Sequence, residues 1–305
     1  MATAFLFPGQ GSQEPKMLED LPSVSVVKDT IEEANEILGK SVYEYNTKKA
    51  MKSTKAVQIS LFVTEVAAFR LFLSNGGKPD YVAGHSVGAF AAAVAAGVIR
   101  YEEGLKLVML RGEAMETIHP EGFGMAVVLG MDINRLQSIV DEIYLDSQQV
   151  YVSNVNAPGQ ITISGSIQGL ELSIEQALRE GAQCASMLNV NTPSHCPLLL
   201  PVSEKLKEAF AEIDMKQPVI PYAGNRRARI LSNREEIKND LILSVAYPVR
   251  WHEATSVLYE KGVRLFIEMP PGNVLSKLAS KAFPNARAFS VLENGYEDCF
   301  YIVNH

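Results

Sequence analysis

Cysteine, tryptophan and long apolar runs are scarce in this chain of 305 residues, which contains three cysteines and one tryptophan. Cys184, Cys196 and Cys299 are odd in number and have no CxxC spacing, which argues against a disulfide framework and a metal cluster. No stretch reaches ~18 apolar residues free of charge, so we expect no membrane span. The N-terminus lacks the pattern of a signal peptide, and we expect a cytoplasmic protein.

Basic residues are fewer than acidic residues in this chain. Lys and Arg total 28 and Asp and Glu total 35, which gives a formal net charge of −7. This balance argues against nucleic acid as the main partner, and an anionic substrate would need a local cation. Hydrophobic residues make up 47% of the chain, enough for one large core and a smaller domain.

What the chain does have is a G-x-S-x-G motif at residues 84–88, between an apolar run and an Ala-rich run. This pattern is typical of a sharp strand-to-helix bend that exposes a nucleophilic serine, here Ser86. The flanking glycines would be needed because a Cβ at either position would collide with the neighbouring strand or helix. The alternative is a Gly-rich turn whose serine caps the following helix.

Two further segments fit a binding site but have ordinary alternatives. The apolar run of residues 2–7 ends in a Gly-rich loop, residues 8–13, which either brings backbone N–H groups to a ligand or is a plain turn. Residues 101–118 form a helix that is apolar on two faces. Arg111 in this helix either holds a substrate carboxylate or pairs with a structural acid.

From Gly124 the pattern changes to strand, helix, strand, strand, helix, strand within ~70 residues, the order of a ferredoxin-like unit. The sequence therefore predicts an α/β protein in which residues 125–191 form an inserted ferredoxin-like domain. Residues 1–124 and 192–305 would form the larger catalytic domain, with a cleft between the two.

Of the five histidines, His195 is the best candidate for a general base, because it follows the inserted segment and lies between two prolines. No aspartate stands out as a third triad member. A basic cluster, Arg226, Arg227 and Arg229, is either a solvated face or a contact for the phosphates of a substrate or acidic carrier.

Five motifs occur in order along the chain: FPGQGSQ, GHSVG, RGEAM, SHC, and PVRW followed by EMPPG. Together they resemble the malonyl-CoA:acyl-carrier-protein transacylase family, over essentially all 305 residues. The segments NVNAPGQ, TPSHCPLL and GNRRAR look most similar to one branch, the acyltransferase (epsilon) subunit of malonate decarboxylase. The resemblance implies an α/β-hydrolase-like core with a parallel sheet and an inserted ferredoxin-like domain.

The resemblance also implies roles for the matched residues. Ser86 would be the acyl-accepting nucleophile, and His195 its general base and then its acid. Backbone N–H groups of Gln10 and Val87 would form the oxyanion hole, and Arg111 would hold the free carboxylate of malonate. No metal and no bound cofactor are expected.

Three assignments concern the rim of the site. The backbone carbonyl of Arg250 would orient His195 in place of an aspartate, and Asn156 would line the cleft. Ser194, where malonyl-selective relatives often have Phe, would leave room for methylmalonyl. Val87, directly after the nucleophile, instead indicates an enzyme selective for unsubstituted malonyl, and we favour malonyl over methylmalonyl as the substrate. Ala89 stands where many relatives have Glu.

The expected function is transfer of a malonyl group from malonyl-CoA to the prosthetic-group thiol of an acyl-carrier protein, by an S-malonyltransferase. As the malonate decarboxylase subunit, it would load a dephospho-CoA derivative and contact other decarboxylase subunits. The alternative is the transacylase of fatty-acid or polyketide synthesis, which loads phosphopantetheine. A serine esterase and a non-catalytic docking subunit fit the residues less well.

Overall fold

The computed structural model describes residues 1–119 and 121–305. The larger of its two sheets consists of β1 (Ala2–Phe7), β2 (Tyr81–Gly84), β7 (Tyr222–Ala223), β8 (Ile230–Leu231), β9 (Val263–Glu268) and β10 (Arg287–Ser290). The strand order is β10-β9-β1-β2-β7-β8. Neighbours from β10 to β7 pair in parallel, whereas β8 runs antiparallel to β7. Ser86 follows β2, which lies in the middle of this sheet.

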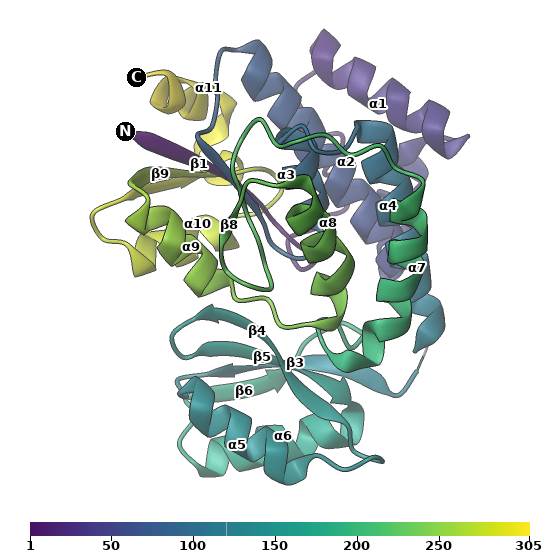
Figure 1. The fold of residues 1–305 in the computed structure, drawn as a ribbon, viewed down its shortest axis with the longest axis vertical. Helices are drawn as coiled ribbons and strands as arrows, with labels where there is room; N and C mark the ends of the chain where they lie inside the picture. Colours follow the sequence, from purple (N-terminus) through teal and green to yellow (C-terminus); the bar gives the residue numbers. More distant parts are fainter. Residues whose placement is uncertain (120) are drawn as a thin grey trace.

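Both faces of the large sheet are covered by helices (Figure 1). Phe5 and Phe7 of β1 join the hydrophobic cluster on one face, whereas Ala4 and Leu6 join the cluster on the other. Alternate residues of a strand point to opposite faces, so a strand buried on both sides reads as a continuous apolar run. The helices of the larger unit are α1 (Ser25–Leu38), α2 (Thr54–Ser74), α3 (Gly88–Ala95), α4 (Tyr101–Ile118), α7 (Leu200–Ala211), α8 (Arg234–Leu243), α9 (Trp251–Glu260), α10 (Val274–Ala282) and α11 (Val291–Asn304).

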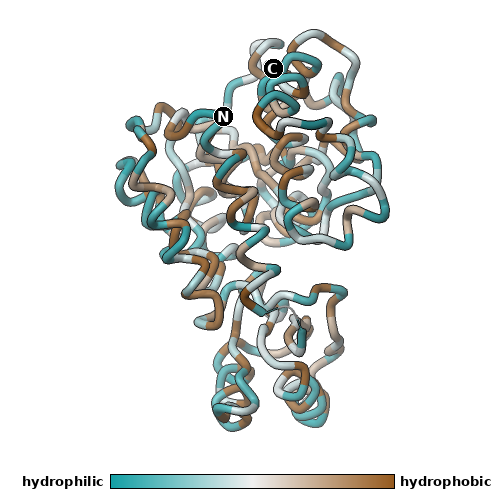
Figure 2. The backbone as a smooth tube through the Cα atoms, turned by 90° about the vertical axis from the view of Figure 1, so that its right-hand side faces the viewer, coloured by the Kyte–Doolittle hydropathy of each residue, from teal (hydrophilic) through white to brown (hydrophobic). Residues whose placement is uncertain are grey.

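Helix α2 is long and apolar enough to cross a membrane by length and composition. It is nevertheless the central core helix of this protein, because 89% of its most apolar window is buried inside the structure. In Figure 2 the apolar segments gather in the interior of the larger unit. The helix is apolar on all sides because it packs against α1, α3 and α4.

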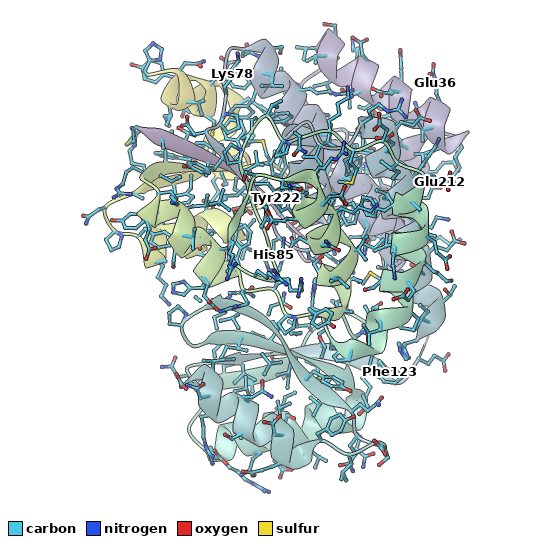
Figure 3. All side chains as sticks on the ribbon, in the orientation of Figure 1. Glu36, Lys78, His85, Phe123, Glu212 and Tyr222 are labelled. Carbon is cyan, nitrogen blue, oxygen red and sulfur yellow. The ribbon has the colours of Figure 1, made fainter. Side chains whose placement is uncertain are left out.

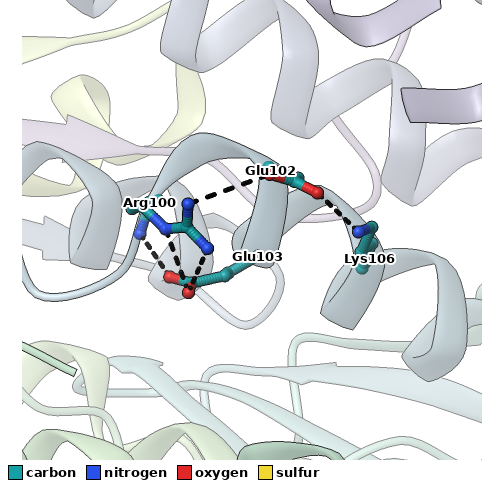
Figure 4. A network of polar contacts seen from close by, with 4 residues as sticks. All are labelled: Arg100, Glu102, Glu103 and Lys106. Carbon is teal, nitrogen blue, oxygen red and sulfur yellow. Dashed lines mark hydrogen bonds and ion pairs between the residues drawn. The ribbon is translucent and has the colours of Figure 1, made fainter. Parts of the chain in front are cut away.

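Helix α4, which carries Arg111, begins in a network of charged side chains (Figure 4). The Glu103 carboxylate accepts a hydrogen bond from the Arg100 backbone N–H at 2.8 Å and from its guanidinium at 2.9 Å. Lys106 donates to Glu102 one turn away at 2.6 Å. Acidic groups in the first turn satisfy free N–H groups and interact favourably with the helix dipole. The network therefore fixes where α4 starts.

The smaller unit is built on a four-stranded antiparallel sheet, which Figure 1 shows beside the larger unit with two helices on its outer side. Its elements are β3 (Phe123–Leu129), α5 (Ile133–Ile143), β4 (Val150–Ala157), β5 (Gln160–Ser166), α6 (Ile167–Arg179) and β6 (Cys184–Met187). The strand order is β4-β5-β3-β6. This element order is the predicted one. The division into domains at residues 124 and 192 stays a prediction.

Backbone hydrogen bonds join the small sheet to the larger unit at Val249. The N–H of Val249 donates to the carbonyl of Ser153, and the N–H of Val155 donates to the carbonyl of Val249, each at 2.9 Å. Val249 thus adds a short parallel bridge to the edge of β4. It lies in the segment between α8 and α9, close in sequence to the residues that surround His195.

One predicted strand is much shorter than expected. The sequence indicates a strand over residues 219–224, but only Tyr222 and Ala223 pair in the sheet. Pro218 and Pro221 have no backbone N–H to donate to a neighbouring strand, and Val219 is 79% exposed.

Candidate active site

Ser86 lies on a sharp turn between β2 and α3, with a positive φ of 56°. A Cβ on Gly84 would lie 2.1 Å from the carbonyl oxygen of Gly88, and a Cβ on Gly88 would lie 2.2 Å from that of Phe7. The need for glycine at both flanking positions is therefore confirmed. A serine held in the left-handed region is strained, and such strain is typical of functional sites.

His195 reaches Ser86 from a segment 109 residues further along the chain, with Nε2 2.7 Å from Oγ. Its Nδ1 lies 2.5 Å from the backbone carbonyl oxygen of Ser244. A carbonyl can only accept, so Nδ1 carries the hydrogen and Nε2 is free to accept from the Ser86 hydroxyl. This is the tautomer that a general base needs.

The prediction that the carbonyl of Arg250 orients His195 is wrong. That carbonyl accepts from the N–H of Ala254 in the first turn of α9, and the Arg250 side chain forms an exposed ion pair with Glu253. The acceptor is instead Ser244, the residue that ends α8. Carbonyls at a helix end have no partner within the helix and are available to other donors.

Arg111 points to the same hydroxyl, with one guanidinium nitrogen 3.1 Å from Ser86 Oγ. Its side chain is buried, it makes no ion pair among the described residues, and its Nε has no hydrogen-bond partner there. Burial lowers the pKa of Arg111 to about 9. The structural alternative, an arginine paired with a protein carboxylate, does not fit this environment. The guanidinium has donors left for an anionic ligand.

Ser86, His195 and Arg111 line one cavity of about 430 Å³. The cavity lies where the large unit faces the small sheet, on the side where Figure 3 labels His85. Burial, followed by the charge of Arg111, lowers the pKa of His195 to about 3. His195 is therefore neutral at pH 7, as a base must be before reaction.

The Gly-rich loop after β1 forms another wall of this cavity and includes Gln10. Within the described part of the chain, neither the N–H of Gln10 nor that of Val87 has a hydrogen-bond acceptor. Free N–H groups beside a nucleophile are what an oxyanion hole requires. The Val87 side chain packs into the hydrophobic core, so it does not act as a wall of the cavity.

The small sheet contributes Asn156, whose Oδ1 lies 3.0 Å from Nε2 of His85, and both residues line the cavity. Burial lowers the pKa of His85 to about 4, so this imidazole is neutral too. Ser194 also lines the cavity, and its carbonyl accepts from the Ser164 hydroxyl at 2.7 Å. Asn156 and Ser194 therefore line the cavity, whereas Arg250 does not.

Two buried residues near Ser86 have no predicted role, although both lie in segments that carry the family resemblance: Asn225 in GNRRAR and Glu268 in EMPPG. Asn225 contacts the backbone on both sides of His85, at Gly84 and at Ser86. Glu268, at the end of β9, lines the cavity and accepts from the N–H of Ser276 at 2.7 Å. Both segments are far from Ser86 in sequence, and no local pattern indicates which groups their side chains contact.

The basic cluster lies outside the main cavity. Arg226, Arg227 and Arg229 line a separate depression together with Asp240. Arg227 and Arg229 are exposed, as expected for a solvated face. Ala89 is buried in the apolar core, where a glutamate side chain would lack water.

Ser86, Arg111 and His195 all lie within the part of the chain that matches a known protein family. The acyl transferase domain family matches residues 4–294. The chain belongs to this family. The malonyl CoA-acyl carrier protein transacylase of Bacillus subtilis is 36% identical over 293 residues, covering 94% of this chain and 92% of the relative. The Escherichia coli K12 transacylase is 33% identical and covers 95% and 96%.

Solved structures share the whole fold. FabD from Acinetobacter baumannii superposes with a TM-score of 0.94 at 34% identity, covering 99% of this chain and 98% of that one. The acyl-carrier-protein S-malonyltransferase of Burkholderia pseudomallei 1710b has a TM-score of 0.93 at 35% identity, with complete coverage of both chains. The predicted transacylase family and α/β fold class are confirmed. The resemblance to the malonate decarboxylase subunit gains no support from these relatives.

Proposed function

We propose that this protein transfers malonyl groups from malonyl-CoA to an acyl-carrier protein of fatty-acid or polyketide synthesis, through a malonyl ester on Ser86. One observation carries the proposal: Ser86 Oγ lies 2.7 Å from a neutral histidine and 3.1 Å from an arginine without a carboxylate partner. The histidine activates the hydroxyl, and the arginine selects an acyl group that ends in a carboxylate.

In the first half of the reaction, Ser86 Oγ attacks the thioester carbonyl while His195 Nε2 takes the hydroxyl proton. The N–H groups of Gln10 and Val87 would hold the oxyanion. When the C–S bond breaks, the proton on His195 passes to the CoA thiolate. The second half is the reverse, with the carrier thiol as attacking group and Ser86 as leaving group.

The choice of carrier follows the relatives. The Bacillus subtilis and Escherichia coli proteins carry the name malonyl CoA-acyl carrier protein transacylase. A malonyl-transacylase has been solved in complex with its type II PKS acyl-carrier protein. The matching chain is 33% identical, with a TM-score of 0.92 and coverage of 97% of this chain and 99% of that one. These similarities favour a phosphopantetheine carrier over the dephospho-CoA carrier of malonate decarboxylase.

Two measurements test the proposal. Incubation with malonyl-CoA should add one malonyl group to the intact protein but none to the Ser86→Ala variant, and an unmodified wild type would contradict it. Transfer should then be measured to a phosphopantetheine carrier and to a malonate decarboxylase carrier. A clear preference for the second would restore the decarboxylase assignment, and rapid hydrolysis without transfer would indicate an esterase.

A further inference from the structure

We infer that Asn225 is a positioning residue, whose side-chain amide clamps the backbone of the nucleophile turn and thereby aims Ser86 Oγ at His195. Its Nδ2 donates to the carbonyl of Gly84 at 2.8 Å, and its Oδ1 accepts from the N–H of Ser86 at 3.1 Å. Asn225 is 1% exposed. The inference rests on the proposed role of Ser86 as the acyl-accepting nucleophile.

The turn needs such support because its conformation is unfavourable. Ser86 has a φ of 56°, and a non-glycine residue in the left-handed region persists only where its surroundings enforce it. The carbonyl of Gly84 and the N–H of Ser86 are an acceptor and a donor separated by one residue. A carboxamide offers a donor and an acceptor on two separate atoms and so matches both backbone groups. An ionised carboxylate can only accept, and a hydroxyl has a single oxygen for both bonds.

Asn225 is itself fixed through its backbone. Its N–H donates to the Asp240 carboxylate at 2.9 Å, and its carbonyl accepts from the N–H of Arg250 at 2.9 Å. The second oxygen of Asp240 accepts from the N–H of Arg226 at 3.0 Å. With both peptide groups held, the amide presents one orientation to the turn. This preorganisation is what distinguishes positioning from general packing.

The clamp bears on the reaction rather than on the binding of substrate, because Asn225 does not line the cavity described above. Without the amide, Ser86 Oγ would no longer be held at hydrogen-bond distance from His195. Since small misplacements of reacting groups slow catalysis steeply, Asn225→Ala should lower kcat by roughly 10- to 100-fold with KM within about twofold.

The first experiment compares wild type, Asn225→Ala and Asn35→Ala by transfer kinetics and by the rate at which a fluorophosphonate labels Ser86. Asn35 is the matched control, because its Oδ1 accepts from the N–H of Val42 at 2.7 Å, in a part of the molecule remote from the cavity. Slower labelling in Asn225→Ala alone supports the inference. Equal labelling in all three overturns it. Labelling does not need malonyl-CoA, so a failure of malonyl transfer in wild type rejects the proposed function without affecting this result.

The second experiment uses Asn225→Asp, which keeps the shape of the side chain in case the alanine variant does not fold. An ionised carboxylate still accepts from Ser86 but repels the Gly84 carbonyl, whereas a protonated carboxyl can donate to it. Because burial favours the neutral carboxyl, labelling relative to wild type should rise from about pH 8 to about pH 5. A ratio independent of pH would mean that the amide does not act as a clamp.

Discussion

The guanidinium of Arg111 and the hydroxyl of Ser86 form a direct hydrogen bond of 3.1 Å inside the protein. Arg111 is buried and has no acidic partner among the described residues. A buried cation of this kind is unfavourable unless a ligand supplies the opposite charge. The malonyl carboxylate would provide the missing partner. The same contact places a positive charge where negative charge develops on the serine oxygen.

Arg111→Ala should therefore lower kcat/KM for malonyl transfer by roughly 100- to 1000-fold, because the carboxylate of the substrate would be buried unpaired. Transfer of acetyl, which lacks the carboxylate, should fall much less. Steady-state kinetics with malonyl-CoA and acetyl-CoA give the ratio directly. An equal loss for both substrates would assign Arg111 a purely structural role.

The pH profile of kcat/KM should show no acid limb near the ordinary pKa of histidine, because the base is His195. Burial and the Arg111 charge lower its pKa to about 3, so the free enzyme keeps a neutral base as the pH falls through 6.5. The profile of kcat/KM against pH should consequently stay level until well below that value. His195→Ala should reduce turnover by roughly 10²- to 10⁴-fold over the whole range. An acid limb centred near the ordinary value would show that the histidine is solvated in solution.

Glu65 of α2 is a buried acid that the proposed reaction does not use. Both of its carboxyl oxygens lack hydrogen-bond partners among the described residues, and burial, followed by Glu268, raises its pKa well above the ordinary value. The folded protein therefore retains a proton that the unfolded chain releases, and its stability falls as the pH rises above the unfolded pKa.

Glu65→Gln removes this titration. The variant should gain stability relative to wild type as the pH rises, by up to about 1.4 kcal/mol per pH unit between the two pKa values. Urea unfolding at several pH values measures the difference. Parallel curves for the two proteins would show that Glu65 has an ordinary pKa in the fold.

Gly88→Ala should disable the site by displacing the loop that carries Gln10. The new Cβ would lie 2.2 Å from the Phe7 carbonyl oxygen and 2.5 Å from that of Pro8, both backbone atoms. Turnover should fall by about 100-fold or more. Gly169→Ala is the control, because its Cβ would lie 2.9 Å from the Gln148 carbonyl in the small unit. If both variants lose only stability, Gly88 serves the fold alone.

The sequence predicted the parts of the site that depend on local pattern. The turn at Ser86 follows from two glycines and the flanking apolar and helical runs, and Arg111 from its place in an apolar helix. His195 was identified by its position after the inserted segment, which the topology then brings to Ser86. The apolar pattern of residues 219–224 overestimates the strand, because Pro221 within it and Pro218 just before it have no N–H for a sheet.

Other parts depend on contacts that no local pattern encodes. Every residue has a backbone carbonyl, so sequence alone does not indicate that Ser244 rather than Arg250 accepts from His195. Asn225 is 139 residues from Ser86, and its place in GNRRAR does not indicate which backbone groups its amide contacts. The pairing of such residues follows from how β2 and β7 lie side by side in the sheet.

The bridge at Val249 has a consequence for the catalytic base. The segment between α8 and α9 is bonded to the small sheet through Val249 and to the ring of His195 through Ser244. One short segment therefore supports both the edge of β4 and the imidazole. A substitution that disturbs the packing of this segment would affect the orientation of the base as well as the attachment of the small sheet.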